Sequence, residues 1–103
     1  MKDFKIIYRI LQALEAGMDE PFFDPEQLAP EALGCTKARR DILLMLLAEK
    51  GLIAGATVRE YPTGRAVAIQ NLRLTLDGLE YLEENSVMKK IRRTAKELSD
   101  LIP

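Results

Sequence analysis

The stretch TKARRDILLMLLAEKGLIAG, residues 36–55, decides how the rest of the chain is interpreted. Thr36 is a residue type that favours the N-cap of a helix, and the apolar run at 42–48 continues that helix. Gly51 then marks its end, because glycine readily adopts the left-handed conformation found after helices. The stretch therefore predicts a helix that passes directly into an extended segment.

The residues that follow predict a β-hairpin. Segments 52–60 and 66–72 flank YPTGR, residues 61–65, whose proline and glycine favour a turn. Val67 and Ile69 alternate with smaller or more polar neighbours, a pattern that indicates one buried face.

On the N-terminal side, residues 3–16 predict a first helix that ends at Gly17. Its apolar residues form two stripes, one of Phe4, Ile7, Tyr8, Leu11 and Leu14, and a second of Ile6, Ile10 and Ala13. A helix that is apolar on two sides is expected to be covered on two sides.

Residues 21–23 predict a short extended strand, and Asp24-Pro25 then starts a second helix. Pro30 predicts that this helix is short or broken, and Gly34 ends it. At the other end of the chain, Thr75 starts a fourth helix that carries Leu76, Leu79 and Leu82. A fifth helix, capped by Ser86, is predicted to reach the C-terminus.

The order helix, short strand, helix, helix, hairpin is typical of the winged helix-turn-helix fold. We therefore predict an α+β, mainly α chain with a three-helix core, a β-hairpin wing and two C-terminal helices. Residues 1–103 are expected to form a single domain, because this length suits one hydrophobic core. Other folds share the same inventory of elements.

Two stretches resemble a known family. They are EKGLI at 49–53 and LTLDGLEYLEEN at 74–85. With the length and the order of elements, they resemble the YjcQ-like proteins, small winged-helix chains of bacterial genomes and prophages. The resemblance implies a winged-helix fold and, by analogy of fold, DNA binding in regulation. It implies no catalytic or ligand-binding residues.

The net charge of −1 conceals a segregation of charge along the chain. Residues 1–35 carry a net charge of −4 and residues 36–73 a net charge of +4. Residues 74–85 contain four acids and no base, and residues 86–103 have a net charge of +3. A chain that is almost neutral overall can therefore present a basic surface.

Catalysis is not expected, and the chain is predicted not to be an enzyme. It contains no histidine, the commonest general base and zinc ligand, and no glycine-rich phosphate-binding motif. Its single cysteine, Cys35, is interpreted as a small buried residue in a turn. We predict no catalytic residue, metal, cofactor or small-molecule ligand. The absence of a signal-peptide pattern and of a membrane-spanning run predicts a cytoplasmic location.

Basic residues suggest double-stranded DNA as a partner, contacted through its phosphates. The candidate contacts are Lys37, Arg39 and Arg40 in the third helix, Arg59 and Arg65 beside the hairpin turn, and Lys89, Arg92, Arg93 and Lys96 in the fifth helix. The fifth helix is amphipathic, since its basic residues lie opposite a stripe formed by Val87, Ile91, Ala95, Leu98 and Ile102.

The third helix favours a different function. If Leu43, Leu44 and Leu47 face the core, then Asp41, Ile42, Met45 and Glu49 face outward, which suits a protein contact better than base recognition. The alternative hypothesis is therefore a module for protein interaction or homodimerisation that does not bind DNA. A homodimer is expected, with the first and last helices supplying much of the contact. Leu46 and Leu47 are both predicted to be essential for folding.

Overall fold

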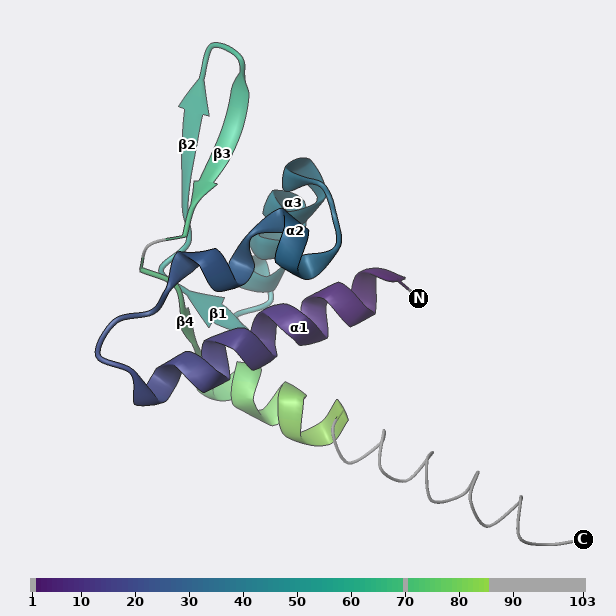
Figure 1. Cartoon of the computed structure of the whole chain (residues 1–103), viewed down its shortest axis with the longest axis vertical. Coiled ribbons are helices and arrows are strands. Elements are labelled where there is room, and N and C mark those ends of the chain that lie inside the picture. The colour runs from purple at the N-terminus through teal and green to yellow at the C-terminus, as the bar shows by residue number, and fades with distance from the viewer. Residues whose placement is uncertain (1, 70, 86–103) are drawn as a thin grey trace, which may run out of the picture.

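The computed structural model describes residues 2–69 and 71–85. The elements, in order, are α1 (Lys2–Ala16), η1 (Gly17–Asp19), η2 (Pro25–Leu28), α2 (Pro30–Leu33), α3 (Lys37–Glu49), β1 (Ile53–Ala54), β2 (Thr57–Tyr61), β3 (Gly64–Ala68) and β4 (Arg73–Leu74). A helix over 76–85 follows β4. The predicted α+β, mainly helical class is confirmed (Figure 1).

The second helical region is broken, as Pro30 predicted. Asp24 caps the 3₁₀ helix η2 by accepting a hydrogen bond from the Glu26 amide at 3.0 Å. Pro30 then starts the single turn of α2, and Gly34, with φ of 74°, ends it in the left-handed conformation.

The strand predicted over residues 21–23 is wrong. This segment forms a bend followed by an irregular stretch. Pro21 has no amide proton for a strand ladder, and Phe23 instead packs its ring against the backbone of Gly17. A side-chain contact with the end of α1 thus takes the place of strand pairing.

Helix α3 begins and ends where the sequence predicted. The Thr36 hydroxyl accepts a hydrogen bond from the Arg39 amide at 3.1 Å, which caps the first turn. Gly51, with φ of 76°, follows the last turn. The amide of Leu52 donates to the Leu47 carbonyl, so the chain leaves α3 in a fixed direction.

The predicted hairpin is present but consists of two antiparallel pairs, β1 with β4 and β2 with β3. Strand pairing is interrupted at residues 55–56 and, among the described residues that follow β3, at 69, 71 and 72. Gly55 has φ of 85° at this interruption, and a β-carbon there would collide with the Asn71 carbonyl. The outer pair, β2–β3, extends beyond the helices at one end of the molecule (Figure 1).

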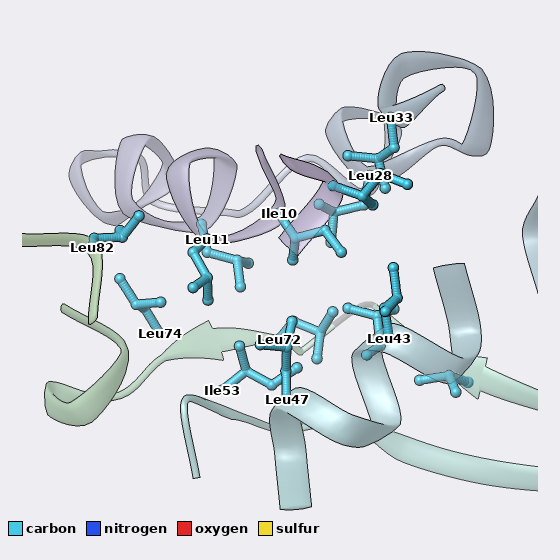
Figure 2. Close-up of a cluster of buried hydrophobic side chains, with 14 residues drawn as sticks. Ile10, Leu11, Leu28, Leu33, Leu43, Leu47, Ile53, Leu72, Leu74 and Leu82 are labelled. Carbon is cyan, nitrogen blue, oxygen red and sulfur yellow. The ribbon is translucent and has the colours of Figure 1, made fainter. Parts of the chain in front are cut away.

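One hydrophobic core joins α1, η2, α2, α3, the base of the hairpin and the helix over 76–85 (Figure 2). Its buried side chains are Ile6, Ile10, Leu11, Leu14, Leu28, Leu33, Leu43, Leu44, Leu47, Ile53, Val67, Leu72, Leu74 and Leu82. These side chains come from positions spread over the whole described chain, so the elements fold around a shared interior.

The two predicted stripes of α1 do not correspond to two covered faces. Ile6 and Ile10 lie in the core, whereas Phe4 is 55% exposed. Ile7 and Tyr8 are half-buried at the margin of the core. The core face of α1 therefore combines residues from both stripes.

In α3, Leu43, Leu44 and Leu47 face the core as predicted. The prediction that Leu46 is a core residue is wrong, because its side chain is 49% exposed whereas that of Leu47 is 3% exposed. Asp41, predicted to face outward, is buried.

One further position departs from prediction. Met45 was expected to face outward but is half-buried, packed against the core. In the helix over 76–85, Leu82 is buried and Leu79 half-buried, but Leu76 is exposed.

No helix in the described part of the chain is long and apolar enough to cross a membrane.

Candidate nucleic-acid interface

The first turn of α3 presents two of the predicted basic residues to solvent. Lys37 and Arg39 are both exposed. Arg39 Nη1 lies 3.3 Å from Asp3 Oδ2 of α1, with the two side chains 57% and 44% exposed. An ion pair this exposed contributes little to stability, so Arg39 can exchange Asp3 for another anion at small cost.

Arg40 does not belong to the exposed basic surface that the sequence predicted. It is 7% exposed, and its guanidinium is engaged inside the protein. Nε and Nη2 donate to Asp41 Oδ1 at 3.2 and 3.1 Å, while Nη1 donates to the Leu28 carbonyl at 3.1 Å. Arg40 therefore joins α3 to η2 and has a structural role.

A signal for this burial exists in the sequence. Arg40 precedes Leu43, Leu44 and Leu47 by three, four and seven positions, the spacing of residues that share one helix face. A face containing those leucines is the core face, so the position of Arg40 indicated that it points inward. Arg40 was nevertheless predicted to be exposed, because arginine is seldom fully buried without a partner.

The register of the hairpin separates the two predicted arginines of the wing. Arg59 is opposite Ala66, and Arg65 is opposite Glu60. Residues directly opposite one another share a face and successive residues alternate, so Arg59 and Arg65 point to opposite faces of the hairpin.

The environments of these two arginines also differ. Arg65 Nε lies 3.3 Å from Glu60 Oε1 across the ladder, with both side chains largely exposed. Within the described residues, Arg59 has no ion-pair partner. The hairpin thus carries one cation that is paired with a neighbouring acid and one that is not.

Two exposed basic residues close to the same elements were not predicted from the sequence. Lys50 directly follows α3, and Arg73 lies in β4 between the buried side chains of Leu72 and Leu74. The alternation around Arg73 was a usable signal, since a residue between two core-facing strand positions points outward.

Apolar side chains are also exposed on α3 and the hairpin. Ile42 is 55% exposed, and Leu46 lies one turn further along the same face. Val58 and Tyr61 of β2 are exposed as well. The outward side of α3 after its first turn therefore offers hydrophobic contact and few groups able to recognise bases.

The remaining predicted contacts, Lys89, Arg92, Arg93 and Lys96, lie outside the described residues. Over residues 2–69 and 71–85, no group of three or more acidic, cysteine or histidine side chains is placed to hold a metal ion. Cys35 is half-buried and forms no disulfide in the turn before α3, and it is less enclosed than the sequence predicted.

Comparison with known proteins identifies a family but no individual relative. A family model described as YjcQ protein matches residues 8–101. That description names no activity, ligand or partner. No curated protein and no solved structure matches the chain.

Proposed function

We propose that this chain, which belongs to the YjcQ protein family, is a winged-helix protein that binds duplex DNA mainly through its phosphates. Helix α3 is the helix presented to the DNA, and the β2–β3 hairpin is the wing. The succession of α1, the broken η2–α2 region, α3 and the hairpin supports this fold. The missing strand between α1 and η2 is a departure from the usual winged-helix pattern.

The separation of charge between segments of the chain carries the proposal. The unit formed by α3 and the hairpin, residues 36–73, contains seven basic and three acidic side chains. Arg40 and Asp41 neutralise each other internally, so the net charge of +4 belongs to the surface. The flanking segments, 1–35 and 74–85, each carry a net charge of −4. This asymmetry orients a polyanion towards α3 and the hairpin.

The hairpin supports contact with phosphates rather than bases. Because Arg59 and Arg65 point to opposite faces, a hairpin lying along a groove can direct one arginine towards each phosphate backbone. Ile42 and Leu46 on α3 offer no hydrogen bonds to base edges, so we expect weak sequence discrimination. We expect the protein to act as a regulator in the bacterial cytoplasm, encoded either by the bacterial genome or by a prophage.

The test is a salt titration of binding to random-sequence duplex, followed by fluorescence anisotropy. The logarithm of the affinity should fall linearly with the logarithm of salt concentration, with a slope of about −0.9 per phosphate neutralised. Arg59→Glu should weaken binding and reduce the steepness of that slope by roughly one. Lys5→Glu, the same charge change at an exposed position of α1, is the matched control and should have a smaller effect. Absence of binding by the unaltered protein at low salt contradicts the proposal.

A second candidate function is protein interaction through α3 without DNA binding, favoured by the exposure of Ile42 and Leu46. In that case the double substitution Ile42→Lys with Leu46→Lys should abolish partner binding, because it removes the exposed apolar side chains. It also adds two positive charges beside the basic residues of α3. The same double substitution should maintain or strengthen binding to DNA. The two functions therefore predict opposite results for one variant.

A further inference from the structure

A groove lies between α1 and the helix over 76–85. This helix lies on the side of α1 away from the hairpin (Figure 1). Tyr8, Leu79 and Leu82 contribute its apolar surface. Three exposed carboxylates, those of Glu15, Glu80 and Glu83, also line it. The groove thus combines hydrophobic contact with a negative rim.

The apolar surface continues along α1 beyond the groove. Phe4 precedes Tyr8 by one helical turn, so the two side chains lie on the same side of α1. Phe4 is 55% exposed and therefore remains uncovered by the described residues. An elongated amphipathic segment would bury this whole strip more completely than a compact ligand.

The chain contains one segment of matching chemistry, residues 86–103, which lies outside the described residues. Its sequence places Val87, Ile91, Leu98 and Ile102 at the spacing of one helix face. The same 18 residues contain five basic and two acidic side chains. This composition is complementary to a groove that offers leucine and tyrosine surface between carboxylates.

The groove is poorly placed for the same molecule's own C-terminal segment. Residues 79–83 line the groove, and their helix continues to Asn85. Two antiparallel helices need a connection of about 2–5 residues. Ser86 is the predicted N-cap of the next helix, so the sequence predicts no connection of that length.

We infer that the groove binds residues 86–103 of a second copy of this chain, so that two molecules exchange their C-terminal segments in a symmetric homodimer. Each dimer then contains two equivalent contacts, as two-fold symmetry requires. The basic α3–hairpin unit lies on the other side of α1 and stays accessible in this arrangement (Figure 1).

Sedimentation equilibrium of the full chain, without DNA, tests the inference. The unaltered protein should be a dimer at micromolar concentrations. In the inferred dimer, Glu80→Lys with Glu83→Lys places lysines of the groove against the basic C-terminal segment. Arg92→Glu with Arg93→Glu places glutamates of the segment against the carboxylates of the groove. Each double variant should raise the dimer dissociation constant about tenfold or more. A matched control is Glu26→Lys with Glu31→Lys, the same charge change at exposed positions that do not line the groove. It should leave the dissociation constant nearly unchanged.

Mixing the two weakened variants identifies which molecule supplies the segment. In a heterodimer of these variants, each groove meets a segment of opposite charge, so mixing should restore dimerisation. Restoration requires that the segment comes from the other molecule. Circular dichroism melts verify that each variant remains folded. A monomeric unaltered protein, dimerisation that neither groove nor segment variant weakens, or no restoration on mixing would overturn the inference.

Discussion

The Thr75 hydroxyl donates a hydrogen bond to the Gly51 carbonyl oxygen at 2.5 Å, and thereby ties the start of the last described helix to the end of α3. The Thr75 hydroxyl oxygen also accepts a hydrogen bond from the Gly78 amide at 3.1 Å, which caps the helix over 76–85. One side chain therefore fixes both the direction and the first turn of this helix. Gly78 permits the close approach, because a β-carbon there would collide with the Leu52 carbonyl.

Thr75→Val tests this connection with almost no change of side-chain volume. We expect a loss of about 1–2 kcal/mol in the free energy of unfolding, because the cap and the bond to Gly51 are removed together. Urea denaturation measures the effect. Thr57→Val, at an exposed strand position, should change stability by less than about 0.5 kcal/mol. Equal effects of the two substitutions would contradict the assignment.

Adjacent leucines of α3 should respond very differently to a charge. Leu47→Asp is expected to abolish cooperative unfolding, since it buries an unpaired carboxylate at a cost of several kcal/mol. Leu46→Asp should lower stability by about 1 kcal/mol or less, because its side chain is half exposed. Thermal melts followed by circular dichroism distinguish the two. Similar melting curves would show that the rotation of α3 is wrong.

The buried pair of Arg40 and Asp41 predicts strong coupling between two substitutions. Arg40→Met should cost about 3–5 kcal/mol, because the Asp41 carboxylate then remains buried without its counter-charge. Adding Asp41→Leu removes that charge, so the double variant should be more stable than Arg40→Met alone. Urea denaturation of all four members of the cycle gives the coupling energy. A double variant less stable than Arg40→Met would exclude this account.

Glu60 is expected to weaken DNA binding, because it holds Arg65 and adds negative charge to the hairpin. Glu60→Gln should tighten binding to random duplex by about two- to fivefold at low salt, a gain that disappears as salt rises. Fluorescence anisotropy at two salt concentrations measures it. The control is Glu49→Gln, the same change at the exposed end of α3, where the carboxylate has no arginine partner among the described residues. If Glu49→Gln increases the affinity for DNA more than Glu60→Gln does, the ion pair with Arg65 is not the cause of the effect.

The features predicted correctly from the sequence are those that depend on residues close together in the chain. Thr36, Gly34 and Gly51 act through the backbone of their own turn, so the limits of α3 and the end of α2 were predicted correctly. The apolar run in α3 was less informative. Seven successive apolar residues carry no periodicity of their own, and Leu46 was therefore grouped with Leu47.

Long-range pairing explains the remaining differences. Arg40 is buried because the Leu28 carbonyl, twelve positions earlier, accepts one of its hydrogen bonds. The opposed faces of Arg59 and Arg65 depend on a strand register that the turn sequence does not specify uniquely. The basic character of residues 36–73 was predicted from composition alone, whereas the directions in which its charges point required the fold.

The exposure of the outer hairpin affects which positions of this protein can change in evolution. Every side chain of β2 is exposed, and within β3 only Val67 reaches the core. Substitutions along the outer strands therefore cost little folding free energy, unlike those in the base that contains Ile53 and Leu74. The outer hairpin can accumulate new side chains, and with them new binding preferences, without endangering the rest of the domain. If the hairpin contacts DNA as proposed, its contacts can change at positions whose side chains the fold leaves exposed.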